Sequence, residues 1–281
     1  MNWKKINIPI QPQILEQIAS LLFNWGASGL EEQNDSFSVY FPQSVWSADK
    51  WDALRGLLKS LVTDSDKIDI SVETIPDQNW NESWKENFKP LRVSERIIIY
   101  PEWETYQPRK EELAIMISPK MAFGTGHHET TRMVLLLMEK YFKAGMRFLD
   151  AGTGSGILAL LAAKMGASEM VAFDNDPVAM ANCRENFELN QIDTPTQLFT
   201  GTLDYIHGQQ FHMITANIER NVLMEMAHDL HRLVVPGGIA ILSGLLDRDA
   251  ATVAALYKDR GWNLIEERQD KEWMALVLRY E

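Results

Sequence analysis

The sequence of 281 residues is poor in cysteine and lacks long uncharged stretches. Its single cysteine, Cys183, excludes an internal disulfide and a zinc cluster built from cysteines. No segment reaches the roughly 18 consecutive apolar residues of a transmembrane helix, so no membrane span is expected. No apolar run follows the first residues, and no signal peptide is predicted. Together these absences predict a cytoplasmic protein.

Basic residues are outnumbered as well. The chain has 27 lysines and arginines against 39 aspartates and glutamates, a formal net charge of -12 at pH 7. An acidic surface repels a phosphate backbone, which argues against direct binding of nucleic acid and suits a basic partner better. Hydrophobic residues make up 46% of the chain and charged residues 23%, a globular composition, and the length allows two domains.

The sequence of residues 1–75 predicts a series of short strands and helices. The alternation and spacing of their apolar residues predict a strand over 6–10, a helix over 13–25, a hairpin over 29–41, a helix over 51–61 and a closing strand over 68–72. This order is that of a ferredoxin-like domain. Since it contains no cluster of polar residues, a role in recognition or packing is predicted.

An aromatic stripe follows this domain. Pro76 breaks the preceding pattern, and Trp80, Trp84 and Phe88 recur at steps of four, which places them on one face of a short helix. The spacing predicts a linker helix over 76–89 that docks on a domain.

From residue 90 to 281 the pattern alternates between strands and helices, which is typical of an α/β domain with a mostly parallel sheet. An antiparallel hairpin, with its turn at 269–271, is predicted to close the domain at the sheet edge. The other predicted elements are strands at Arg147–Asp150, Met170–Asp174, Thr196–Thr200, His212–Ala216 and Gly238–Ser243, and helices at Gly156–Met165 and Val222–Leu233.

The most informative stretch, over 148–158, is predicted to be a strand, a glycine-rich turn and the start of a helix. Gly152, Gly154 and Gly156 let the backbone bend sharply and let a ligand approach the main chain. Ile157 occupies the last position of the dinucleotide pattern G-x-G-x-x-G, which argues against a dehydrogenase.

Asp150 precedes these glycines. A pyrophosphate binds well at a helix N-terminus, but a nearby carboxylate repels it. The same carboxylate attracts a cofactor that carries an ammonium group. The loop therefore predicts a cofactor site that includes Asp150 and the three glycines.

Polar residues also follow other predicted strands. Asp174 ends the second strand, where an acid hydrogen-bonds the ribose of an adenosine cofactor or is simply solvated. Asp176 and Pro177 are the expected N-cap and first residue of the next helix. Asn217 follows the fourth strand, at the edge where ligands bind in parallel sheets, and its alternative role is to cap the next helix. Asp204, in the loop after the third strand, is better explained as a solvated acid than as an adenine contact.

The segment 121–131 comes just before the sheet. Two glycines that bracket a threonine suggest a mobile loop, and Thr130 and Thr131 open the next helix. His127 and His128 are adjacent, and neighbours in sequence rarely bind one ion together. Since no carboxylate or cysteine pattern joins them, no metal site is predicted.

These pieces together resemble the ribosomal protein L-eleven methyltransferases, bacterial enzymes that modify the stalk-base protein of the large ribosomal subunit. Many methyltransferases share the glycine loop, whereas the A-F-G-T-G segment, its Thr-Thr and the later A-N-I are much more specific. The domain order also agrees, so the resemblance covers nearly the whole chain. The matching segments are 121–126 with His128, Thr130 and Thr131, then 150–158, 216–218 and the tryptophan-rich 79–85.

The resemblance implies a class I methyltransferase: a Rossmann-like parallel sheet with a C-terminal antiparallel hairpin, and S-adenosylmethionine as methyl donor. It places cofactor contacts on Thr131, Gly152, Asp174 and Asn217. The N-terminal domain is expected to hold the basic ribosomal protein that is the substrate.

The implied reaction transfers a methyl group to a neutral lysine or N-terminal amine. Its site needs water exclusion and acceptors for the remaining N–H groups, for which the Asn217 side-chain oxygen and the Ile218 carbonyl are candidates. Phe123 is predicted to close over the site, or only to pack. His127 and Glu129 stand where threonine and proline are frequent in the family, which affects the expected shape of the closed loop.

Two alternatives stay open. One is a related enzyme that methylates another protein amine. The other is a non-catalytic adaptor, which would be expected to lose Asp174, Asn217 or the glycines, all of which are present.

Overall fold

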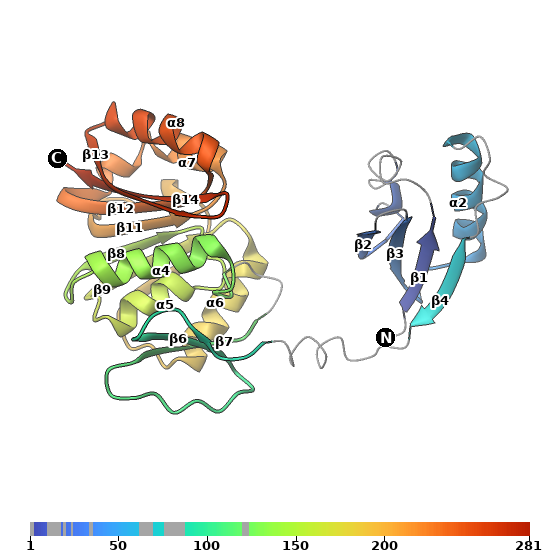
Figure 1. Cartoon of the computed structure of the whole chain (residues 1–281), viewed down its shortest axis with the longest axis horizontal. Coiled ribbons are helices and arrows are strands. Elements are labelled where there is room, and N and C mark those ends of the chain that lie inside the picture. The colour runs from blue at the N-terminus through green and yellow to red at the C-terminus, as the bar shows by residue number, and fades with distance from the viewer. Residues whose placement is uncertain are drawn as a thin grey trace. The chain divides into compact units, whose positions relative to one another are not determined.

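Figure 1 shows the computed structural model of the protein, which describes residues 3–9, 18, 21–23, 25–33, 36–61, 70–75, 88–119 and 124–281. Contacts within the chain divide it into two compact units, residues 1–87 and 88–281. Each unit buries its own hydrophobic residues. Within the described residues, no helix combines the length and the apolar character that crossing a membrane requires.

The first unit contains an antiparallel sheet of four strands in the order β2-β3-β1-β4. Side chains alternate along its strands, so Ile6 of the first strand and Val39 of the third lie opposite each other and are fully buried. Leu54 and Leu58 of the long helix complete this core. The elements are β1 Trp3–Ile8, β2 Gly29–Gln33, β3 Ser36–Pro42, α2 Ala48–Leu61 and β4 Ser71–Ile75.

The predicted hairpin and second helix of this unit are confirmed. The closing strand begins later than predicted, because its pairing with β1 starts at Ser71, opposite Asn7. Of the helix over 13–25, Ile18 and residues 21–23 are described and helical. The linker helix lies outside the described residues up to residue 87, and the ferredoxin-like assignment stays a prediction.

The second unit is built on a sheet of seven strands in the order β10-β9-β8-β11-β12-β14-β13. All neighbours are parallel except that β14 runs antiparallel to both β12 and β13. The predicted edge hairpin is thereby confirmed. The strands are β8 Arg147–Ala151, β9 Glu169–Asp174, β10 Thr196–Thr200, β11 Phe211–Asn217, β12 Val234–Leu246, β13 Trp262–Asp270 and β14 Trp273–Tyr280.

Helices cover both faces of this sheet, with α4, α5 and α6 on one side and α7 and α8 on the other (Figure 1). The central strands are therefore buried on both faces: Phe148 packs toward the first group of helices and Leu149 toward the second. The helices are α4 Glu129–Tyr141, α5 Ile157–Lys164, α6 Pro177–Leu189, α7 Arg220–Met226 and α8 Asp247–Lys258.

The helix predicted over Val222–Leu233 is wrong at its C-terminal end, because α7 stops at Met226 and a short 3₁₀ turn covers Leu230–Arg232. After Ala227 the backbone bonds change to three-residue spacing, as in Asp229 N–H to Met226. The tighter winding keeps Leu230 buried, so the apolar periodicity continues through the break.

A separate sheet of three strands, which the sequence did not predict, lies outside α5 and α6. Ile99 and Ile115 are buried in the same core as these helices. The β-branched run at residues 97–99 was the available signal. The strands are β5 Leu91–Arg92, β6 Ile97–Pro101 and β7 Leu113–Ile117, with β6 parallel to β7.

The packing of α8 on α7 includes a buried hydrogen bond from the Tyr257 hydroxyl to the Leu223 carbonyl, 2.9 Å long. Tyr257→Phe removes this bond and should cost about 1 kcal/mol, which lowers the melting temperature by about 2–4 °C. Tyr205→Phe is the matched control, because Tyr205 is 70% exposed, and it should melt like the wild type. Equal thermal shifts in the two variants would contradict a stabilising role for the buried bond.

Candidate active site

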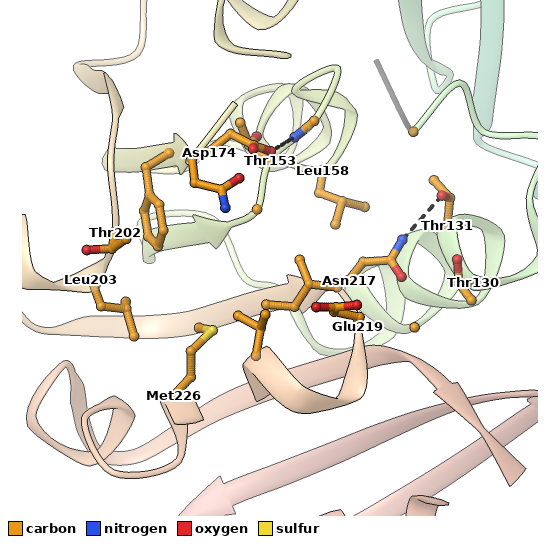
Figure 2. A pocket seen from close by; sticks show the side chains of 18 of the residues that line it. Thr130, Thr131, Thr153, Leu158, Asp174, Thr202, Leu203, Asn217, Glu219 and Met226 are labelled. Carbon is orange, nitrogen blue, oxygen red and sulfur yellow. Dashed lines mark hydrogen bonds between the residues drawn. The ribbon is translucent and has the colours of Figure 1, made fainter. Parts of the chain in front are cut away.

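A pocket of about 740 Å³ opens at the carboxyl ends of the parallel strands. Pairing of β8 with β9 and β11 sets Ala151 opposite Phe173 and Ala216, so the residues that follow these strands meet at one edge. The start of α4 and the first turns of α7 complete the wall. Figure 2 shows Asn217 and Thr131 on one side of the pocket and Asp174 on another.

Two glycines allow loops to approach Ile218 closely. A Cβ on Gly152, which has φ of +71°, would lie 2.2 Å from the Ile218 side chain. A Cβ on Gly244, with φ of +85°, would lie 2.3 Å from the Ile218 carbonyl oxygen. Only glycine fits such approaches, so the turn after β8 and the irregularity at Gly244 in β12 enclose Ile218 at the pocket wall.

Asp174 braces the glycine loop from the end of β9. One carboxylate oxygen accepts a hydrogen bond from the Gly154 amide at 2.9 Å, and the other accepts one from the Asp176 amide at 3.0 Å. Asp176 caps α6 through the Val178 amide at 2.8 Å, as predicted. Asp174 and Gly154 both line the pocket, where the sequence analysis placed a cofactor.

Asp150 lies behind the pocket wall. It is fully buried and accepts hydrogen bonds from the hydroxyls of Thr153, at 2.6 Å, and Thr215, at 2.7 Å. Burial raises its pKa from 3.8 to about 6, against the lowering effect of the two hydroxyls. Gly156 also lies away from the wall, at the start of α5 beside Cys183. Neither residue lines the pocket, and their role as cofactor contacts stays a prediction.

Asn217 is the last residue of β11 and lines the pocket. Its side-chain nitrogen donates to the Thr131 hydroxyl at 3.3 Å, which joins the sheet edge to α4 (Figure 2). Its side-chain oxygen is buried and has no hydrogen-bond partner among the described residues. The alternative role as a helix cap is wrong, because Glu219 is the N-cap of α7.

The loop before α4 is held at several points. His128 caps α4, accepting from the Thr130 amide at 3.3 Å, and its ring lies 5.1 Å from that of Trp273. The His127 ring packs 4.4 Å from that of Phe88, and burial lowers its pKa. Phe123, predicted to close over the site, lies outside the described residues.

Glu129, at the start of α4, forms ion pairs. Its carboxylate lies 2.6 Å from the Lys271 ammonium and 3.8 Å from the Arg132 guanidinium. The hydrogen bond from Lys271 lowers the pKa of Glu129 to about 2. Since Lys271 forms the β13–β14 turn, these contacts fasten the hairpin beside Trp273, which lines the pocket.

The charged side chains that line the pocket within the described residues are all acidic: Asp174, Asp204, Glu219, Glu225 and Asp229. Asp204 is exposed, as predicted for a solvated loop acid, and it also lines the pocket. Such a lining attracts cations, and it suits a ligand that carries a positive charge.

The sequence analysis missed Gly244, Glu219 and Trp273 as wall residues. Gly244 had a signal, because glycine inside a strand often marks a close backbone approach. No sequence signal was available for Trp273, because its place in the pocket depends on where the β13–β14 hairpin crosses α4.

A Rossmann-like parallel sheet that ends in an antiparallel hairpin, with a glycine loop after β8 and an acid after β9, defines a class I methyltransferase. Residues 2–281 match the family described as Ribosomal protein L11 methyltransferase (PrmA). The chain therefore belongs to the ribosomal protein L11 methyltransferase family.

Individual relatives agree with this assignment. The ribosomal protein L11 methyltransferase of Chloroflexus aurantiacus is 31% identical over 99% of this chain and 98% of its own length. That of Heliobacterium modesticaldum is 32% identical over the same shares. The crystal structure of a ribosomal protein L11 methylase from Lactobacillus delbrueckii subsp. bulgaricus covers 69% of this chain and 100% of its own, with TM-score 0.64 and 29% identity.

The raised pKa of Asp150 makes stability depend on pH. Because its pKa is about 6 in the fold and near 3.8 otherwise, the folded state binds the proton more tightly between these values. Stability is therefore lost as pH rises from 4 to 7, on the order of 3 kcal/mol from this group. Asp150→Asn cannot lose this contribution. Its free energy of unfolding relative to wild type, measured with denaturant, should therefore increase as pH rises from 4 to 7. A constant difference would show that the carboxyl keeps an ordinary pKa.

Proposed function

We propose that the protein methylates amino groups of ribosomal protein L11, on lysine side chains, the N-terminal amine or both, with S-adenosylmethionine as donor. The observation that carries this proposal is the Asn217 side-chain oxygen, a buried acceptor without a partner among the described residues, in an acid-lined pocket. Family membership supports the choice of substrate, because the relatives are named for that protein.

The pocket fits the donor in charge and shape. S-adenosylmethionine supplies an activated methyl group on a positively charged sulfur, and it also carries an ammonium group. The acidic lining favours both charges, and Gly152 and Gly154, which line the pocket, present no side chain to the ligand. We assign Asp174 to hydrogen bonds with the ribose hydroxyls of S-adenosylmethionine. Thr131 and Asn217 are assigned to further contacts with the same molecule.

The accepting amine must lose its proton before it attacks. For a lysine with pKa about 10.4, neutralisation at pH 7 costs roughly 4.6 kcal/mol, and for an α-amine of pKa about 8 roughly 1.4 kcal/mol. The Asn217 side-chain oxygen and the Ile218 carbonyl would accept the remaining N–H groups and orient the nitrogen. An amide does this without adding a negative charge that would hold the proton. Phe123 would help to exclude water.

The N-terminal domain, residues 1–75 within the first unit, is proposed to bind the substrate protein, because the reaction pocket is formed by residues of the second unit. The net charge of -12 suits a basic partner rather than a nucleic acid. Methylation of an amine on a different protein is the competing proposal, and that protein would also need to be basic.

The direct test incubates purified protein with S-adenosylmethionine and L11 and measures added methyl groups by mass spectrometry. Asn217→Ala should reduce turnover by about 100-fold, as loss of a positioning contact does. Asn217→Asp should also be slow, since a carboxylate holds the amine in its charged form. Thermal melts of the three proteins are the folding control. Full turnover in Asn217→Ala would remove the main catalytic assignment, and an unmethylated L11 would refute the substrate.

Cofactor affinity tests Asp174 separately. Asp174→Ala should weaken S-adenosylmethionine binding by about 1.5–3 kcal/mol, roughly 10- to 150-fold, because hydrogen bonds to a charged acceptor are lost. Asp176→Ala is the matched control: this acid caps α6, does not line the pocket and should lower only the melting temperature. Calorimetry that finds Asp174→Ala within about twofold of wild type, about 0.4 kcal/mol, would exclude Asp174 as a ligand.

A further inference from the structure

Three asparagines, Asn182 and Asn186 of α6 and Asn190 at its C-cap, form hydrogen bonds along the edge of β7, where a neighbouring strand would otherwise pair. Asn190 accepts from the Met116 amide at 3.0 Å and donates to the Met116 carbonyl at 2.6 Å. Asn182 donates to the Ser118 carbonyl at 3.1 Å. The fit is geometric, since four residues of a helix advance about 6 Å and two residues of a strand about 6.6 Å. Side-chain amides therefore satisfy the open edge of β7.

Asn186, the middle asparagine, departs from this pattern. Its oxygen accepts from the Ser118 amide at 2.7 Å, but its nitrogen donates to the Ser155 carbonyl in the glycine loop at 2.8 Å. Asn186 is fully buried. One side chain thus connects the end of β7 to the loop that follows β8.

The connection continues to the pocket. The Ser155 hydroxyl donates to the Gly124 carbonyl at 2.7 Å. Gly124 and Gly154, on either side of this bond, both line the pocket. Asn186 does not line it.

We propose that Asn186 is a positioning residue: by holding Ser155 against the chain that leaves β7, it sets the distance between the two pocket walls at Gly124 and Gly154. This inference rests on the proposed function, because it takes the donor to bind between these walls. Asn190 makes equivalent bonds to β7 without reaching the glycine loop, and this makes it a matched control.

The test compares Asn186→Ala with Asn190→Ala in the full chain by thermal melting and by calorimetry with S-adenosylmethionine. Asn186→Ala loses the bonds to Ser118 and Ser155, and Asn190→Ala loses those to Met116 and to the Asn186 carbonyl. Both variants should therefore melt several degrees lower. Only Asn186→Ala should raise the dissociation constant, by about tenfold, while Asn190→Ala stays within about twofold. Equal dissociation constants in the two variants would overturn the proposal.

A second pair of variants, Asn186→Asp and Asn190→Asp, tests the proposal even if the alanine variants fold poorly. Asn186→Asp keeps the acceptor for Ser118 but donates to Ser155 only when protonated, and burial favours the protonated form. Its affinity relative to wild type should therefore rise as pH falls from 9 to 6. Glu102, which accepts from the Ser118 hydroxyl at 2.9 Å, is present in both proteins, so its contribution cancels in the ratio.

Asn190→Asp should show a constant ratio over the same range, since its bonds do not reach the pocket. A constant ratio for Asn186→Asp would overturn the role of the Ser155 bond. Wild-type protein that binds no S-adenosylmethionine would refute the proposed function itself, which is a different result from equal binding by the variants.

Discussion

The parallel pairing of β8 with β9 on one side and β11 on the other is the constraint on which the site depends. Parallel strands end at the same edge of a sheet, so the chain must turn there three times within a small area. Gly152, Asp174 and Asn217 follow or end these strands and meet at one pocket. A shift of register by one residue would turn inward-facing side chains outward and separate them.

Charge and chemistry make opposite demands on this pocket. Its acidic lining attracts a sulfonium and a protein ammonium, yet nearby carboxylates also favour the protonated form of an amine. On the proposed function, the group that meets the nitrogen is the neutral amide of Asn217, fixed by Thr131. Asp150 is fully buried and accepts hydrogen bonds from the hydroxyls of Thr153 and Thr215. The division lets carboxylates attract the ligands while an amide orients the amine.

The wall is supported by elements that are remote in sequence. The turn of the β13–β14 hairpin is joined to α4 by the ion pair of Lys271 with Glu129. The three-stranded sheet supports the glycine loop through Asn186. Both supports lie in the second unit, so the shape of the pocket is set by packing around the sheet on more than one side.

The sequence by itself determined the strand, glycine loop and helix around Gly152, the cap at Asp176 and the edge hairpin, because each follows from spacing and turn chemistry within a few residues. Only the tertiary structure decided which of the predicted residues face the pocket. It moved Asp150 behind the wall and brought Gly244 and Trp273 into it. The three-stranded sheet of β5, β6 and β7 also became apparent only in the tertiary structure. The physical reason is that local hydrogen bonding and periodicity act between near neighbours, whereas a wall depends on strand register and on close approaches between distant segments.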